Sequence, residues 1–75
     1  MNIADLKLGQ KAVVTGFSDE ELSLRLLDMG CLPGEEVTLC CKAPLGDPIA
    51  IDVAGSRVSL RIREASTVMI EKINN

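Results

Sequence analysis

The chain has 75 residues, a formal net charge of −3 at pH 7 and a single aromatic residue, Phe17. This length allows one domain, 1–75, with a small aliphatic core. The acidic balance disfavours binding to nucleic acid or to an anionic membrane, and the lack of Trp and Tyr removes the side chains that stack on bases. Because the chain has no His, the commonest general base and metal ligand is missing, and an enzyme is the least favoured class.

The chain begins with a lead-in of ten residues, without the charged and apolar regions of a signal peptide. Three apolar residues are expected to anchor it: Ile3, Leu6 and Leu8. The next segment, 11–17 (KAVVTGF), is predicted as a strand, in which Gly16 marks a bulge or a close backbone approach. No run approaches the ~20 apolar residues of a membrane-spanning helix. The sequence therefore predicts a cytoplasmic protein without membrane insertion.

A capping box from Ser18 to Glu21 predicts a helix that runs to about Met29. Its apolar stripe comprises Leu22, Leu24, Leu26, Leu27 and Met29. Gly30 stands where a helix closes on a left-handed residue, and Pro33-Gly34 then makes a turn. This helix is expected to be inserted into a β fold.

A second strand is predicted at 36–42, with Val37, Leu39 and Cys41 on one face. The chain has three cysteines, Cys31, Cys40 and Cys41, and none forms a C-x-x-C pair. Because neighbouring residues of a strand point to opposite faces, Cys40 and Cys41 are not expected to bind one ion. No metal site is expected, and these two thiols are the only candidates for one, Cys40 because it is expected to face outward.

The segment 49–62 is predicted as a hairpin around a two-residue turn at Gly55-Ser56. This register places three apolar pairs on one face: Val53 with Val58, Ile51 with Leu60 and Ile49 with Ile62. The other face carries Asp52 as a diagonal neighbour of Arg57 and Arg61. A helical turn at 63–66 and a last strand at 67–73 complete the chain, so that about five short strands and one helix predict a small, mainly β barrel.

Few residues stand out as candidates for binding a partner. Leu32 and Leu45 lie in loops among turn residues, where each either folds back onto the core or stays exposed as a contact. Arg57 and Arg61, together with Arg63, either form a basic strip for an acidic partner or belong to a solvated strand face that Asp52 partly neutralises. The partner-binding candidates are therefore Leu32, Leu45, Arg57 and Arg61.

The breaker-rich run at 24–39 also resembles the FeoA family, small proteins associated with ferrous iron uptake. The helix, stop and strand pattern of that family is matched by Leu22 or Leu26, Met29, Gly30, Leu32, Pro33, Gly34 and Val37. Its proline-rich loop is matched by Ala43, Pro44, Gly46, Asp47 and Pro48, and its later strand by Gly55, Val58, Leu60, Arg61, Glu64 and Ala65. The early leucine and glycine fit Leu6 and Gly9. The Cys40-Cys41 pair and Cys31 depart from the pattern and keep a role for the thiols open.

The resemblance implies an SH3-like barrel with an inserted helix and a cytosolic protein that is not an enzyme. It further implies an accessory that docks on FeoB, a membrane transporter of ferrous iron with a cytosolic GTP-binding domain. It implies no resident cofactor and leaves transient Fe²⁺ or another divalent metal, and weak self-association, open. The alternatives are a domain of the kind found in DtxR-type metal-dependent regulators and a metal-binding protein that acts through its thiols.

Overall fold

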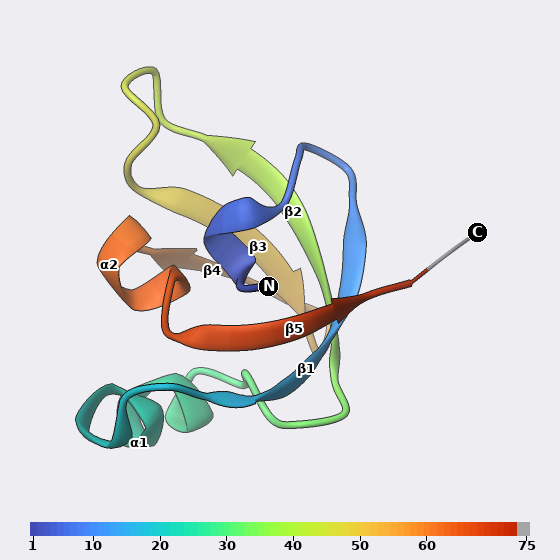
Figure 1. Ribbon diagram of the computed structural model, residues 1–75. Helices are drawn as coiled ribbons and strands as arrows, with labels where there is room; N and C mark the ends of the chain where they lie inside the picture. Colours follow the sequence, from blue (N-terminus) through green and yellow to red (C-terminus); the bar gives the residue numbers. More distant parts are fainter. Residues whose placement is uncertain (74–75) are drawn as a thin grey trace.

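Five antiparallel strands form the framework of the computed structural model, which describes residues 1–73 (Figure 1). They are β1 (Lys11–Phe17), β2 (Glu36–Lys42), β3 (Ile49–Val53), β4 (Ser56–Leu60) and β5 (Val68–Lys72), in the order β4-β3-β2-β1-β5. The helical elements are the 3-10 helix η1 (Ile3–Asp5) and the α-helices α1 (Glu20–Asp28) and α2 (Ile62–Ala65). This mainly β architecture, with a helix inserted after the first strand, confirms the predicted fold class.

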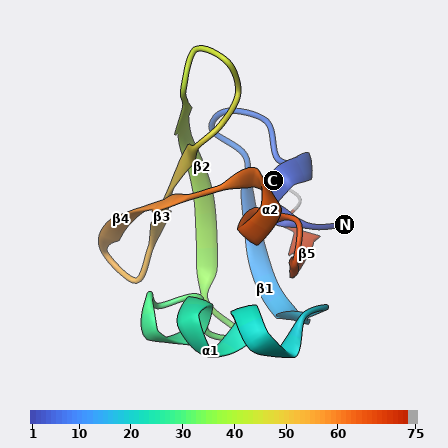
Figure 2. The ribbon, with the colours of Figure 1, turned by 90° about the vertical axis from the view of Figure 1, so that its left-hand side faces the viewer.

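The two ends of the sheet carry different elements (Figures 1 and 2). In both views α1 lies at one end, and the loop between β2 and β3 projects from the other end. The short helix α2 joins the edge strands β4 and β5, and η1 lies beside β5, where Asn2 bridges Met69. The β2–β3 loop and α1 therefore mark the two ends of the sheet.

The core is aliphatic, as the composition requires. Its fully buried members come from every element of the fold: Ile3, Leu6, Ala12, Val14, Leu26, Cys31, Val37, Leu39, Ile49, Ile51, Val53, Leu60, Ala65, Val68 and Ile70. Phe17 packs against this cluster without being fully buried. The predicted anchors Ile3 and Leu6 are confirmed, whereas the prediction for Leu8 is wrong because it is 63% exposed beside the turn at Gly9.

Two β-bulges interrupt the pairing of the sheet. In β1 the register against β5 shifts between Val14 and Gly16, which confirms the bulge predicted at this glycine. In β2 the register against β3 shifts between Leu39 and Cys41. This second bulge was not predicted, and it turns Cys41 away from the core face on which simple alternation placed it.

The helix α1 begins one residue later than the sequence predicted. The N-cap is Asp19, whose Oδ1 accepts a hydrogen bond from the Leu22 N–H at 3.1 Å. Ser18 does not cap, because its N–H donates to the Thr67 carbonyl at 2.8 Å and so continues the β1–β5 pairing. The predicted capping box is therefore wrong in its residues, although the helix it announced is present.

The apolar stripe of α1 is narrower than predicted. Leu26 is fully buried, and Leu22 and Met29 pack against the core from its margin. Leu24 is 70% exposed, so its assignment to the stripe is wrong. A nine-residue helix at the end of a small barrel covers the core with one line of side chains, and Leu24 lies off that line.

Gly30 ends α1 in a Schellman motif. Its φ is +102°, its N–H donates to the Leu27 carbonyl at 3.0 Å, and the Cys31 N–H donates to the Leu26 carbonyl at 3.0 Å. The buried side chains of Leu26 and Cys31 provide the apolar contact that accompanies this motif. The helix stop predicted from the sequence is thus confirmed, and it also brings Cys31 into the core.

The β3–β4 hairpin is present, but its predicted register is wrong by two residues. Val53 pairs with Ser56, Ile51 with Val58 and Ile49 with Leu60. The turn is Ala54-Gly55, with φ of 52° and 79°, which is the type I′ pattern and not the predicted turn at Gly55-Ser56. A slip of two residues keeps every side chain on its face. It leaves Ile62 outside the hairpin as the first residue of α2 and places Asp52 directly opposite Arg57.

Glu64 is the one buried charged side chain among residues 1–73, with 5% of its surface exposed. Its Oε1 accepts a hydrogen bond from the Arg61 N–H at 2.9 Å, at the start of α2. Its Oε2 lies 3.5 Å from Arg25 Nη1 and makes no hydrogen bond with the described part of the chain. Glu64 therefore links α1 to the start of α2.

We expect Gly30→Ala to lower the free energy of unfolding by about 1 to 2 kcal/mol, because an L residue is strained in the left-handed region. A Cβ at this position has room, since the nearest side-chain atom, Val53 Cγ1, is 3.9 Å away. Gly16→Ala is the control, because Gly16 has open space and no left-handed φ. Urea unfolding followed by circular dichroism measures both, as the chain lacks Trp and Tyr. Equal losses for the two variants would contradict the Schellman argument.

We also expect Glu64→Ala to cost about 1 to 3 kcal/mol of unfolding free energy, because it leaves the Arg61 N–H without its acceptor. Arg25→Ala should cost about 1 kcal/mol or less, since the side chain of Arg25 is 69% exposed and its ion pair is screened by water. The same urea experiment compares the two variants. If Arg25→Ala were as costly as Glu64→Ala, the ion pair and not the helix cap would be the main contribution of Glu64.

Candidate functional site

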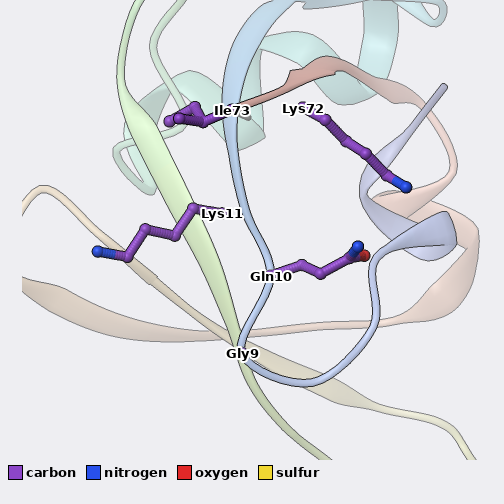
Figure 3. A pocket seen from close by; sticks show the side chains of 5 residues that line it. All are labelled: Gly9, Gln10, Lys11, Lys72 and Ile73. Atoms are coloured by element: carbon purple, nitrogen blue, oxygen red, sulfur yellow. The ribbon is translucent and has the colours of Figure 1, made fainter. Parts of the chain in front are cut away.

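One concave surface lies beside the start of β1 and is lined by Gly9, Gln10, Lys11, Lys72 and Ile73 (Figure 3). Its volume is about 260 Å³. Figure 3 shows that the two lysine side chains point to opposite sides, Lys11 with Ile73 and Lys72 with Gln10. Because their ammonium groups do not converge on a common point, this hollow offers no anion site.

A second pocket, of about 390 Å³, lies where three parts of the chain meet. Arg25 comes from α1, Asp47 from the β2–β3 loop, and Arg61, Arg63 and Glu64 from the start of α2. Asp47 Oδ1 accepts a hydrogen bond from the Ile62 N–H at 3.0 Å. Together with the bond from the Arg61 N–H to Glu64, this contact satisfies the first two N–H groups at the start of α2.

The acidic side chains of this pocket already have partners, whereas two of its arginines form no ion pair within residues 1–73. Asp47 and Glu64 each have one oxygen bonded to backbone, and Arg25 lies beside the other oxygen of Glu64. Within residues 1–73, neither Arg61 nor Arg63 forms an ion pair. Both arginines are exposed, so the pocket presents two guanidinium groups to a ligand or a partner.

The β2–β3 loop carries the most exposed apolar side chain of the described residues. Leu45 is 96% exposed. The loop around it is held by hydrogen bonds from the Ala43 N–H to the Pro48 carbonyl at 2.9 Å and from the Gly46 N–H to the Ala43 carbonyl at 2.7 Å. Since Asp47 also ties the loop to α2, the base of the loop that carries Leu45 is fixed.

The four partner-binding candidates do not lie on one surface. Leu32 is 45% exposed in the segment after α1, and α1 lies at the end of the sheet opposite the β2–β3 loop, which carries Leu45 (Figure 1). Arg57 forms an ion pair with Asp52, with 2.9 Å between Nε and Oδ1, and this hydrogen bond raises the pKa of the guanidinium. Arg61 lies instead in the pocket at α2. Of the four candidates, Leu45 and Arg61 belong to segments that are joined by a hydrogen bond. Asp47, in the loop of Leu45, accepts it from the N–H of Ile62, the residue after Arg61.

Sequence reasoning singled out neither Arg25, Asp47 nor Glu64 as part of a site. Glu64 stands three residues after Arg61, the spacing of a capping box, and this signal could have placed its carboxylate at the start of α2. Arg25 and Asp47 are brought there from distant parts of the chain, and no local pattern announces their meeting.

The three cysteines occupy different environments. Cys31 is fully buried, and burial raises the pKa of its thiol. Cys40 is half-buried and Cys41 exposed. The expectation that Cys40 and Cys41 point to opposite faces is wrong, because the bulge in β2 brings both to the outer face of the sheet. Within residues 1–73, no group of three or more Cys, Asp or Glu side chains is arranged to hold a metal ion.

None of the helices in residues 1–73 has the length and apolar character needed to cross a membrane.

The structure is similar to several solved proteins. A FeoA-like protein from Clostridium acetobutylicum superimposes with a TM-score of 0.92 at 30% identity, covering 100% of this chain and 88% of that one. For FeoA of Stenotrophomonas maltophilia complexed with zinc, described as an SH3 domain protein, the TM-score is 0.81 at 33% identity, covering 95% and 89%.

A manganese-dependent transcriptional repressor also superimposes, with a TM-score of 0.87 over 97% of this chain and 36% of the repressor. At 12% identity this likeness shows the fold alone.

In sequence, the chain is 30% identical over 76 residues to a fusion of Fe(2+) transport protein A and the Fe(2+) transporter FeoB from Porphyromonas gingivalis. The match covers 100% of this chain and 9% of the fusion protein. The sequence profile of the FeoA domain matches residues 1–72. Together with the SH3-like barrel, this match over almost the whole length shows that the chain belongs to the FeoA domain family.

Proposed function

We propose that this protein is a cytoplasmic accessory of ferrous iron transport that docks on the cytosolic GTP-binding domain of a FeoB-like transporter. It acts as a binding partner and not as an enzyme. The observation that carries the proposal is the relative in which a FeoA region and a FeoB transporter form one polypeptide. Fusion of two domains holds them at high mutual concentration, which is useful where they work in contact.

The docking surface that we propose consists of Leu45, Arg61 and Arg63. Leu45 is almost fully exposed on a loop that is held by its own hydrogen bonds, so binding costs little loop ordering. Arg61 and Arg63 line the pocket that Asp47 of the same loop also lines, and neither forms an ion pair in the described part of the chain. This surface fits a partner that offers an apolar hollow flanked by carboxylates.

The proposal leaves Leu32 and Arg57 outside the docking surface. Leu32 follows α1, the helix at the other end of the sheet from the β2–β3 loop, and the guanidinium of Arg57 is already engaged by Asp52. A rigid partner of moderate size that covers Leu45 and the arginine pocket does not need either residue.

A regulator-type domain is the alternative, and the likeness to the manganese-dependent repressor supports its fold and not a role. In that structure the matched region is 36% of the chain. The net charge of −3 does not favour DNA binding by this chain. The accessory role is therefore the better supported of the two.

We expect Leu45→Asp to weaken binding to the cytosolic domain of the FeoB-like partner by about tenfold or more, because burial of a leucine contributes roughly 1.5 to 3 kcal/mol. The double variant Arg61→Ala, Arg63→Ala should weaken binding as well and make it less sensitive to salt. Isothermal titration calorimetry with the partner loaded with GDP, or with a GTP analogue that is not hydrolysed, measures both effects.

Leu24→Asp is the matched control, since Leu24 is also an exposed leucine but lies on α1. It should leave the affinity unchanged, and circular dichroism should show that all variants are folded. Loss of binding with Leu32→Asp but not with Leu45→Asp would move the docking surface to the other end of the sheet. No binding at tens of micromolar in either nucleotide state would refute the proposed function itself.

A further inference from the structure

The second β-bulge gives the Cys40-Cys41 pair a geometry that an ordinary strand does not allow. Thr38 pairs with Asp52, and Leu39 pairs with the core residue Ile51. The next pair is Cys41 with Ala50, so Cys40 is the extra residue of the bulge. Two residues of β2, Cys40 and Cys41, therefore stand opposite the single residue Ala50 of β3.

Both thiols consequently lie on the outer face of the sheet. Cys40 is there by alternation from Leu39, whose side chain is buried. Cys41 is there because it pairs with Ala50, which shares a face with Asp52 and not with the core residues Ile49 and Ile51. The exposure agrees with this placement, since neither Cys40 nor Cys41 belongs to the core and Cys41 is exposed.

The neighbouring Cys41 side chain raises the pKa of Cys40, and partial desolvation raises it further. The charged groups that face the pair are Asp52 of β3 and Arg57 of β4, and Arg57 acts on Cys40 in the opposite direction. Asp52 Oδ1 lies 2.9 Å from Arg57 Nε, so this oxygen is engaged by the guanidinium.

We propose that Cys40 and Cys41 form a chelating dithiolate site for a soft monovalent metal ion, with Cu(I) as the ion that fits best. Thiolate ligands favour Cu(I), Zn and Fe–S clusters, and of these the soft monovalent ion accepts two sulfur ligands. Zinc in proteins is held by four ligands in structural sites and three in catalytic ones, and residues 1–73 offer no third Cys, Asp or Glu to complete such a set. This inference is independent of the proposed docking on the transporter.

Binding replaces two S–H bonds by two Cu–S bonds. Each thiol gives its proton to solvent, so that one Cu(I) enters and two protons leave, with no change in oxidation state. Because each thiol must lose its proton on binding, the affinity should increase as the pH rises. Asp52 and Arg57 keep their mutual ion pair and take no part in coordination.

The test is a competition titration of the reduced protein with Cu(I), without oxygen, against bicinchoninate as the coloured chelator. We expect one Cu(I) per chain. Cys40→Ser and Cys41→Ser should each lower the affinity by about 10²-fold or more, because each removes the second half of a chelate. The double variant should be little worse than either single variant, since one remaining thiol gains nothing from the pair.

The matched control is the double variant Cys41→Ser, Lys42→Cys. It keeps the same number of thiols, but residue 42 pairs with Ile49 and so belongs to the other face of the strand. It should bind Cu(I) no better than Cys41→Ser. Cys31→Ala, which leaves the outer pair intact, should bind as the natural sequence does. Lys42→Ala should do so too, and it controls for the loss of the lysine in the double variant.

Three results would overturn the proposal. One is wild-type affinity in Cys40→Ser or Cys41→Ser, and another is wild-type affinity in the control that moves a thiol to the other face. The third is a complex of two chains per Cu(I) in light scattering, which would assign the metal to an interface between copies. All three are measured without the transporter, so failure here leaves the docking proposal untouched.

Discussion

The constraint on which this structure depends is curvature. A sheet of five short strands must bend far enough to enclose a core of Ile, Leu and Val, because the chain has one aromatic side chain to fill space. Bulges are how a sheet bends sharply while keeping its inner face apolar. In β1 the extra residue is Thr15, directly before Gly16. In β2 the extra residue is Cys40, whose side chain lies on the outer face of the sheet. The bulge that helps to close the barrel thus also places both thiols on the outer face. This placement follows from the curvature of the sheet and not from any bond between the cysteines.

The short helix α2 is the second point at which folding decides what the surface offers. It joins the two edge strands of the sheet, and the N–H groups at its start need acceptors. Asp47 and Glu64 supply them, from the β2–β3 loop and from α2 itself. Two carboxylates that could have neutralised Arg61 and Arg63 are thereby used for the backbone. The same contact of Asp47 fixes the base of the loop that presents Leu45. The same set of hydrogen bonds therefore leaves Arg61 and Arg63 without ion pairs in the described residues and holds the loop that exposes Leu45.

The parts of the fold that were predictable from the sequence are those with local signals. The strands 11–17 and 36–42 alternate clearly, and the stop at Gly30 combines a left-handed position with the following Pro33-Gly34 turn. The hairpin register was not predictable from its glycine, because the turn places Ala54 at positive φ, a conformation that the sequence does not signal. The bulge at Cys40 has no glycine either, so alternation assigned its neighbour to the wrong face. The pocket at α2 depends on Arg25 and Asp47 meeting across the fold, and no local pattern contains that information.

The proposed docking surface is small, and its size has a consequence for how an accessory of this kind works. Full burial of Leu45 contributes roughly 1.5 to 3 kcal/mol, which is about ten- to a hundredfold in affinity. Exposed arginines add on-rate and orientation more than affinity. A surface of this kind, acting alone, supports an association that forms and dissociates readily. A covalent link removes the need for affinity, since it holds a domain at an effective concentration on the order of millimolar. The fused relative has such a link, with the FeoA region as 9% of its length. A separate chain with the same fold has to bind through its own surface, which makes its docking sensitive to concentration and to salt in a way that the fusion is not.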